Sequence, residues 1–227
     1  MKRQWVIPPE ADAEFVCAME DVLEVYQRDF DPQRPVLCVD EASKQLVSET
    51  RVPRRAAPGQ PARFDYEYER QGTANLFLVT EPLVGQRHLQ VTDRRTAVDF
   101  AAFVRKIVDE WYPAAEKIVL VMDNLNTHKP ASLYEAFAPA EARRLVEKLE
   151  IHYTPKHGSW LNIAEIEFSL LSRQCLDRRI ASKQQLAKEI AAWQRQRNCQ
   201  CGTVDWQFTT KEARIKLKRL YPSIKES

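Results

Sequence analysis

The sequence has little glycine and no long apolar run, and each absence excludes a class of protein. Only five glycines occur among 227 residues, and no two of them fit the G-x-G-x-x-G or G-x-x-x-x-G-K-S/T patterns that bind nucleotide phosphates. The longest apolar strand-like run, Ile118 to Met122, is far shorter than the roughly 20 residues that span a bilayer. The N-terminus has no apolar signal core either. We therefore expect a cytoplasmic protein with neither a classical nucleotide-binding site nor a membrane anchor.

Cysteine is also scarce. The five cysteines are an odd number and are scattered along the chain, which is typical of reduced thiols rather than of a disulfide framework. Cys199 and Cys201 lie two residues apart, but a zinc site needs four ligands and no matching pair lies nearby in the sequence. The sequence indicates a reducing compartment and no structural zinc.

Charge is balanced overall but not locally. The chain has 34 basic and 32 acidic residues and a net charge of +2. Residues 173–197 contain seven lysines and arginines against two acidic residues, and the last twenty residues are basic as well. A basic C-terminal third is compatible with a polyanionic partner, and equally with an ordinary solvated helix face.

Apolar periodicity predicts one α/β domain between two helical ends. We divide the chain into a leader helix at 1–34, a domain at 35–180 and a basic helical tail at 181–227. Strands are expected at 35–43, ending at Asp40, and at 74–83, 87–93, 117–124 and 151–156. Helices are expected in the leader and at 96–112, 131–149, 159–176, 184–198 and 212–221. The leader helix has an apolar stripe at helical spacing, formed by Phe15, Met19, Val22, Leu23 and Tyr26.

The order of these elements predicts the fold. Three strands are followed by helix, strand, helix, strand and helix, which indicates a mixed sheet of three antiparallel and then two parallel strands, flanked by helices. This is the order of a ribonuclease-H-like domain. We also expect a turn at Gly85, helix N-caps at Thr96 and Ser159, and a helix break near Pro139.

Two aspartates follow apolar strands that are neighbours in such a fold. Asp40 follows the first strand and Asp123 the fourth, so their carboxylates should converge at one edge of the sheet. Adjacent carboxylates repel unless they are protonated or bridged by a cation, and oxygen ligands favour Mg²⁺ or Mn²⁺. Aspartates that only cap turns would give the same pattern. A third carboxylate should come from the helix at 159–176, where periodicity does not choose between Glu165 and Glu167.

Three blocks of sequence carry a family resemblance: VDE at 39–41, MDNLNTH at 122–128 and YTPKHGSWLNIAEIEFSLL at 153–171. In these blocks, and in shorter segments over nearly its whole length, the chain resembles bacterial insertion-sequence transposases of the insertion sequence 630 family, within the mariner-like superfamily. The resemblance assigns the family's DDE triad to Asp40, Asp123 and Glu165, since Glu165 completes the N-x-x-E step of SWLNIAE. Glu167 is then expected beside the site or on the surface.

The resemblance implies metal-dependent phosphoryl transfer on DNA. It places two Mg²⁺ ions on the triad, with Mn²⁺ as a substitute, to activate water for cutting at the element ends and then to align the freed 3′-hydroxyl for attack on target DNA. A stand-alone nuclease of the same fold and a non-catalytic DNA-binding relic or inhibitor are the alternatives.

Candidate DNA contacts lie beside the triad. Asn124 and His128 follow the second aspartate closely enough to reach the metal ions or the scissile phosphate, although a turn asparagine and a helix-start histidine would look the same. The loop before the third carboxylate should attract phosphate, because backbone N–H groups and a helix dipole point there. Its candidates are Lys156, His157 and Ser159.

A loop rich in arginine and proline at 49–63 follows the first strand. In mariner-like relatives an insertion at this place resembles a clamp that grips the partner subunit and end DNA. This makes Arg51, Arg54 and Arg55 candidates for DNA or dimer contacts, with a solvated loop as the competing interpretation. A homodimer is expected.

One departure from the family concerns the recognition of DNA ends. Family members usually begin with helix-turn-helix modules, and only 39 residues precede Asp40. We expect such a module to be encoded separately, or the chain to be a truncated or relic copy, working on DNA in the bacterial cytoplasm at the nucleoid. Trp160, Trp193 and Trp206 are expected to be packing anchors rather than platforms for DNA bases.

Overall fold

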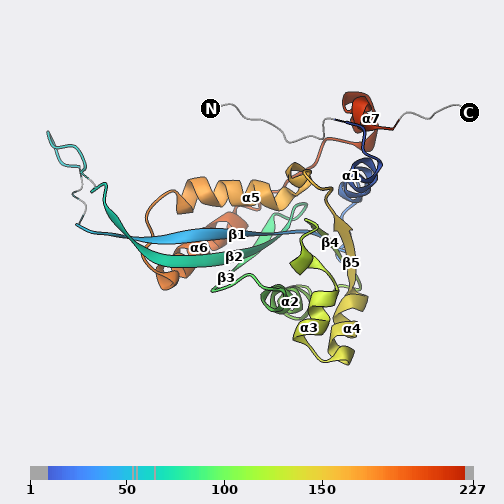
Figure 1. Ribbon diagram of the computed structural model, residues 1–227, viewed down its shortest axis with the longest axis horizontal. Helices are drawn as coiled ribbons and strands as arrows, with labels where there is room; N and C mark the ends of the chain where they lie inside the picture. Colours follow the sequence, from blue (N-terminus) through green and yellow to red (C-terminus); the bar gives the residue numbers. More distant parts are fainter. Residues whose placement is uncertain (1–9, 53, 55, 64, 223–227) are drawn as a thin grey trace, which may run out of the picture.

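The computed structural model describes residues 10–52, 54, 56–63 and 65–222, and its centre is a five-stranded mixed sheet with helices on both faces (Figure 1). The strands are β1 (Val36–Glu49), β2 (Tyr68–Glu81), β3 (Gln86–Thr92), β4 (Ile118–Met122) and β5 (Leu149–Tyr153). Their spatial order is β3-β2-β1-β4-β5. The first three strands pair antiparallel, and β4 and β5 extend the sheet from β1 in parallel. The predicted ribonuclease-H-like α/β arrangement is confirmed.

The predicted helices are present in the described part of the chain. They are α1 (Ala13–Tyr26), α2 (Ala97–Lys106), α3 (Ala131–Ala136), α4 (Pro139–Lys148), α5 (Ile163–Leu171), α6 (Lys183–Cys199) and α7 (Thr210–Lys216). Among these described helices, none combines the length and the apolar character needed to cross a membrane.

The sheet separates two apolar cores, because successive side chains of a strand point to opposite faces. Leu37 and Val39 of β1 pack with residues of α2, α3 and α4. Cys38, between them, packs with residues of α1, α5 and α7. A third cluster joins α6 and the end of α5 to the middle of the β1–β2 ribbon through Leu46 and Leu76.

Both ends of the described chain belong to the core beside α5. The predicted stripe of α1 is buried, and this helix is capped by Asp12, whose side chain accepts from the N–H of Phe15. The backbone N–H of Asp12 also donates to the carbonyl of Leu220 at 3.0 Å. Buried Ala213 of α7 and Leu220 complete this cluster. The division at residues 34 and 180 remains a prediction, while α1 and α7 share one core with the sheet.

Several local signals of the sequence have the expected effect. Thr96 caps α2 in a reciprocal capping box with Asp99. Helices α3 and α4 are separate, with Pro139 at the start of α4. Gly85 turns the chain between β2 and β3 with φ 71°, and a Cβ there would lie 2.7 Å from the carbonyl carbon of Cys201. Glycine is therefore required at this turn.

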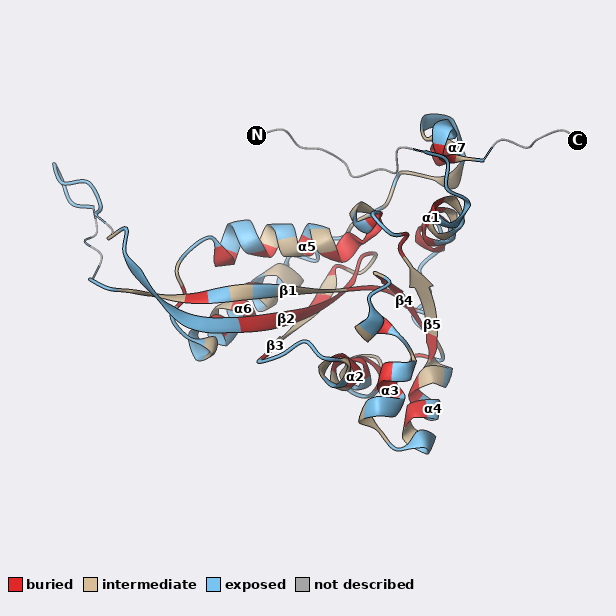
Figure 2. Ribbon diagram, in the orientation of Figure 1, coloured by how far each residue is buried: buried red, intermediate tan, exposed pale blue. Residues whose placement is uncertain are grey.

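The first strand is longer than predicted. It does not end at Asp40 but continues to Glu49, and β2 begins at Tyr68 rather than at 74. Pairing between β1 and β4 stops at Cys38, so the rest of β1 pairs with β2 alone. The residues at 68–73 are exposed, and Figure 2 shows this pale part of the ribbon leaving the covered body. An apolar run marks only the part of a strand that is covered on both faces, which is why the sequence missed the extension.

The helix predicted at 159–176 is divided into three parts. Ser159–Leu161 is a 3₁₀ turn, α5 begins at Ile163, and Ser172–Leu176 is a π segment. The N-cap is Asn162 rather than Ser159, since the Asn162 side chain accepts from the N–H of Ala164 at 3.1 Å. The same side chain donates to the carbonyl of Val39 at 2.9 Å, which ties the start of α5 to β1.

Glu167 does not lie on the surface. Its side chain is 1% exposed and forms ion pairs with Arg87 of β3 and Arg197 of α6, each at 3.2 Å. Arg87 itself is fully buried and also donates to the carbonyl of Gly202. This buried charge cluster connects α5 to β3 and α6, so Glu167 fixes the position of α5.

Glu167→Gln should destabilise the fold by about 3–5 kcal/mol, because the buried guanidinium of Arg87 and the partly buried one of Arg197 would lose the carboxylate that compensates them. Chemical denaturation followed by circular dichroism measures the loss. Glu147→Gln removes the exposed ion pair with Arg143 and should cost less than about 1 kcal/mol. Equal losses in the two variants would contradict a structural role for Glu167.

Candidate active site

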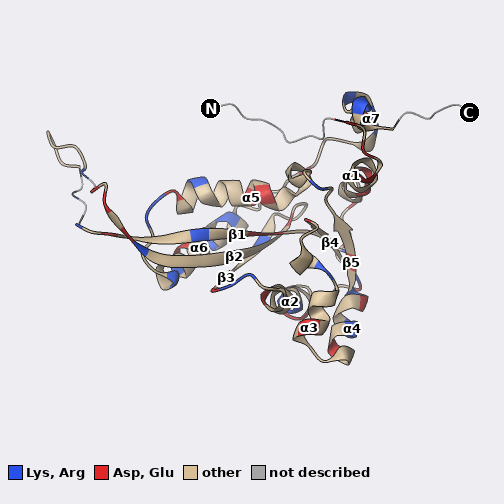
Figure 3. Cartoon of the chain, in the orientation of Figure 1, with Lys and Arg blue, Asp and Glu red and all other residues tan. Residues whose placement is uncertain are grey.

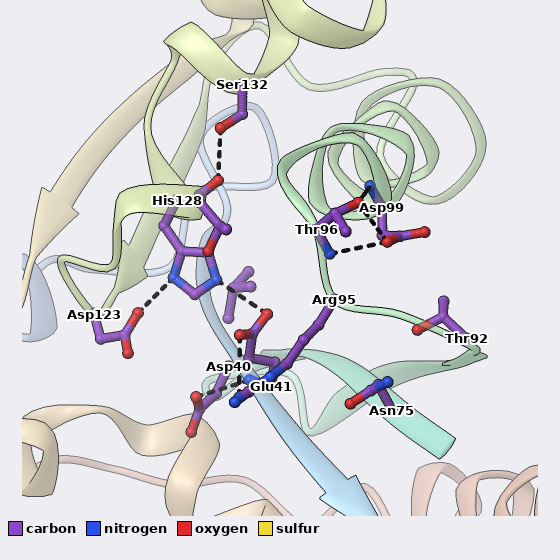
Figure 4. Close-up of polar contacts among 12 residues, drawn as sticks. Asp40, Glu41, Asn75, Thr92, Arg95, Thr96, Asp99, Asp123, His128 and Ser132 are labelled. Carbon is purple, nitrogen blue, oxygen red and sulfur yellow. Dashed lines mark hydrogen bonds and ion pairs between the residues drawn. The ribbon is translucent and has the colours of Figure 1, made fainter. Parts of the chain in front are cut away.

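Asp40 and Asp123 lie at the same level of the sheet, each two residues beyond the last β1–β4 pair. That pair is Cys38 with Val121, in a parallel register. Parallel strands bring equivalent positions side by side, and Figure 4 shows the two carboxylates at this edge of the sheet. The predicted convergence of the two strands is confirmed, although β1 continues past its aspartate.

The environment of Asp40 disfavours its charged form. Burial raises the pKa of Asp40 to about 7, against the effect of the Glu41 backbone N–H, which donates to Oδ1 at 2.8 Å. The negative charges of Asp123 and Glu165 raise this pKa further, and His128 lowers it. Asp123 and Glu165 therefore both act electrostatically on Asp40, with Glu165 supplied by the first turn of α5.

The buried ring of His128 contacts the carboxylate of Asp123. Its Nδ1 lies 2.5 Å from Oδ1 of Asp123, and its Nε2 lies 3.4 Å from a carboxylate oxygen of Glu41. Burial lowers the pKa of His128, but the hydrogen bonds and charges of these two carboxylates outweigh burial and raise the pKa to about 9. The ring is protonated at neutral pH and compensates part of the acidic charge.

Glu41 was not identified from the sequence. It follows Asp40 directly, so its side chain points to the opposite face of β1, where it meets His128 and lies 3.5 Å from Arg95. Its side chain is only 4% exposed. One signal in the sequence could have identified Glu41. Glu41 lies two residues after Val39, so the two side chains share the strand face that packs into the core, where an acidic residue is unusual.

The other predicted contacts of the site divide into exposed and buried residues. Asn124 is exposed beside Asp123, and the loop before α5 is exposed at Lys156, His157 and Ser159. His157 has a left-handed φ of 63°, which is uncommon outside glycine. His128, expected to reach metal or phosphate, is fully buried with both ring nitrogens facing carboxylates. It positions Asp123 instead of facing solvent.

The arginine-rich loop lies far from these carboxylates. It forms the tip of the β1–β2 ribbon, which extends away from the body of the molecule (Figure 1). The Arg51 side chain is 82% exposed and lies 3.3 Å from Asp65, and exposed Arg54 makes a backbone bridge with Arg63. Arg55 lies outside the described residues. Within one chain, the loop and the three carboxylates therefore lie on different parts of the molecule.

The basic stretch at 173–197 is largely paired with acid. Figure 3 shows blue and red segments interspersed along α5, α6 and the ribbon. Ion pairs with carboxylates are formed by four of its basic residues: Arg178, Arg179, Lys183 and Arg197. Four of the seven basic residues in this stretch are therefore paired with carboxylates of the same chain.

The donor set at the triad fits a hard divalent cation. Carboxylate oxygens are the ligands that Mg²⁺ and Mn²⁺ prefer. Burial is the main cause of the raised pKa of Asp40, and the negative charges of Asp123 and Glu165, which a cation would neutralise, add to it. In the part of the chain that the structure describes, no three acidic, histidine or cysteine side chains are gathered closely enough to enclose an ion.

Comparison with protein families decides the identity of the domain. A family model described as DDE superfamily endonuclease matches residues 35–187, which is more than half of the chain. The chain belongs to the DDE superfamily endonucleases. Comparison with curated proteins gave no match.

Solved structures similar to this DDE endonuclease include those of the mariner Mos1 transposase. The Mos1 paired-end complex with Mg has a TM-score of 0.56 and 16% identity, covering 98% of this chain and 68% of that one. The Mos1 catalytic domain has a TM-score of 0.53 and 11% identity, covering 86% of this chain and 96% of that one. The paired-end complex with Mn has a TM-score of 0.54 and 15% identity, with coverage of 92% and 68%. At these identities the likeness establishes the fold.

Asp40→Asn should stabilise the metal-free DDE domain at pH 8, and the gain should shrink as the pH falls toward 4.5. The pKa of Asp40 is raised from 3.8 to about 7 by folding, so the stability that its protonation contributes is lost as the pH rises through 7. An amide has no charge to bury, and the expected gain at pH 8 is on the order of 2 kcal/mol.

Urea denaturation in the presence of a chelator, at both pH values, measures this gain. Asp177→Asn, at an exposed position, is the matched control and should change little. If the wild type is as stable as Asp40→Asn at pH 8, the ionised Asp40 carboxylate does not lower the unfolding free energy, and the prediction is wrong.

Proposed function

We propose that this chain is the catalytic domain of a transposase that cuts DNA at the ends of a mobile element and joins the freed 3′ ends to target DNA. The observation that carries the proposal is the parallel register that brings Asp40 beside Asp123, within electrostatic reach of Glu165. Asp40 and Asp123 each lie two residues past the last β1–β4 pair, and the charge of Glu165 raises the pKa of Asp40. The family match supports DNA as the substrate. We assign the chain to the bacterial insertion sequence 630 family on the sequence blocks that it shares with that family.

Asp40, Asp123 and Glu165 would hold two Mg²⁺ ions, and Mn²⁺ would replace them. Bound metal supplies an activated water and neutralises charge on the reacting phosphate. The protonated ring of His128 holds Oδ1 of Asp123, which orients this carboxylate and leaves Oδ2 for the site. Similar Mos1 complexes with Mg and with Mn support the choice of ions.

The exposed residues around the triad would position the DNA. Asn124 follows Asp123, and the loop before α5 presents Lys156, His157 and Ser159 to solvent. We propose that these groups contact the phosphates that flank the scissile bond, where lysine and backbone N–H groups compensate charge. The protein would work in the bacterial cytoplasm, on DNA of the nucleoid.

The tip of the β1–β2 ribbon would reach a second copy of the chain and its DNA. The β1–β2 ribbon that carries this tip extends away from the body of its own chain (Figure 1), and the Arg51 side chain is 82% exposed. The paired-end complexes of Mos1 support an assembly that holds two DNA ends. We propose a homodimer, with end recognition supplied by a separately encoded helix-turn-helix module.

Each triad variant should lose metal-dependent nicking of DNA while keeping its fold. We expect Asp40→Asn, Asp123→Asn and Glu165→Gln to reduce the rate by more than roughly 100-fold, since each removes a carboxylate from the proposed ion site. The matched control is Glu135→Gln, at an exposed position on α3, which should nick at the wild-type rate. Wild-type nicking by any triad variant, in Mg²⁺ or Mn²⁺, would overturn the assignment of that residue.

The ribbon tip is tested by replacing Arg51 and Arg54 together with alanine. Both residues are exposed, so the unfolding free energy should change by less than about 0.5 kcal/mol. DNA affinity and the dimer fraction should fall together, and the salt dependence of binding should become shallower by about 0.9 for each phosphate that the variant no longer neutralises. Sedimentation with and without DNA measures both, with Arg143→Ala as the control. An unchanged dimer fraction and DNA affinity would leave the ribbon tip as a linker.

A further inference from the structure

A groove of about 930 Å³ lies between the outer side of α5 and the segment that contains α7. Its walls are aromatic, formed by Trp160 from the turn before α5 and by Trp206 and Phe208 from the segment before α7. Basic side chains of Arg173 and Lys216 line it as well. Its volume lies within the range of about 300–1,000 Å³ that is usual for small-molecule sites.

The groove begins at the proposed catalytic carboxylate. Glu165, Ile166 and Ser169 of α5 all line it. At 100° per residue these three positions fall within an arc of about 100° on the helix, so one face of α5 supplies both the acidic group and the floor of the groove. Ile166 is 39% exposed there, which leaves an apolar surface open beside the triad.

The aromatic walls are held in place by the fold. Trp206 packs against Tyr26, with ring centroids 5.3 Å apart, and its Nε1–H donates to the carbonyl of Phe208 at 2.9 Å. The rings of Trp160 and Phe208 are tilted with centroids 6.2 Å apart. These rings are therefore oriented before any ligand arrives.

The charge of the groove selects its occupant. The ammonium of Lys216 lies 5.5 Å from the ring centre of Phe208, and its side chain is 61% exposed. Arg173 is exposed and donates to the carbonyl of Ser169 within its own helix. Aromatic faces combined with exposed cations are the elements that bind unpaired nucleic acid, because bases stack on the rings and phosphates pair with the cations. Lys216 also pairs with Glu212 at 2.8 Å, whereas Arg173 forms no ion pair with any residue that the structure describes, so a purely apolar partner would bury the charge of Arg173 without compensation.

We propose that the groove binds an unpaired, unstacked segment of the DNA strand that lies across the triad. Its bases would stack on Phe208 and Trp160, and its phosphates would contact Arg173 and Lys216. This inference rests on the proposed function, since DNA reaches Glu165 only if the triad acts on DNA. It assigns to Trp160 and Trp206 a role beyond the packing expected from the sequence.

The test compares two fluorescent single strands of equal length, an oligothymidylate and an abasic strand, by anisotropy in the presence of a chelator. Both carry the same phosphates, but only the first carries bases. We expect Phe208→Leu, which keeps an apolar side chain, to weaken oligothymidylate binding by roughly 5- to 100-fold and to leave abasic binding unchanged. Phe208→Trp should retain base-dependent binding. Arg173→Gln should weaken both probes alike, because it removes only a phosphate contact.

Tyr134→Ala, at an exposed aromatic residue of α3, is the control and should bind both probes like the wild type. Equal affinity of the wild type for the two probes, or an equal loss on both in Phe208→Leu, would overturn the proposal. The proposal would also be overturned if Phe208→Leu changed the oligomeric state seen by sedimentation but bound both probes like the wild type. That result would indicate that a second copy of the chain occupies the groove. Nicking by Asp40→Asn at the wild-type rate would refute the proposed function separately, because the probe measurement requires no cleavage.

Discussion

The parallel pairing of β1 with β4 is the constraint on which the site depends. It ends at Cys38 and Val121, and it thereby brings Asp40 and Asp123 to the same edge of the sheet. Burial of Asp40, together with the negative charges of Asp123 and Glu165, opposes the ionisation of Asp40 and raises its pKa to about 7. A buried carboxylate lowers the stability of the fold, which is expected at the catalytic site that we propose.

The rest of the structure holds this unfavourable arrangement in place. Asn162 caps α5 and at the same time binds the carbonyl of Val39, one residue before Asp40. On another flank of α5, Glu167 is fixed by ion pairs with buried Arg87 of β3 and partly buried Arg197 of α6. These two anchors determine the position and rotation of the helix that carries Glu165. Behind Asp123, protonated His128 supplies the positive charge that stabilises the acidic cluster.

The sequence predicted the order of the strands and the pair of aspartates because both depend on apolar runs that end at polar residues. It missed the long ribbon formed by β1 and β2, since an open ribbon has no continuous apolar signal. Periodicity alone did not distinguish Glu165 from Glu167, because both lie beside the buried stripe. What separates them is long-range: Arg87 and Arg197 compensate Glu167 from elements distant in sequence. The contact of Glu41 with His128 is equally long-range.

The central claim is that Asp40, Asp123 and Glu165 share one electrostatic environment that a divalent cation would relieve. Titration of the Asp40 carboxyl carbon by NMR tests this most directly, in wild type and in Glu165→Gln, with and without Mg²⁺. The account predicts a midpoint near pH 7 without metal, a lower midpoint in Glu165→Gln, and a clear further decrease when Mg²⁺ is added to the wild type. A midpoint near 4 that neither the substitution nor Mg²⁺ changes would contradict it.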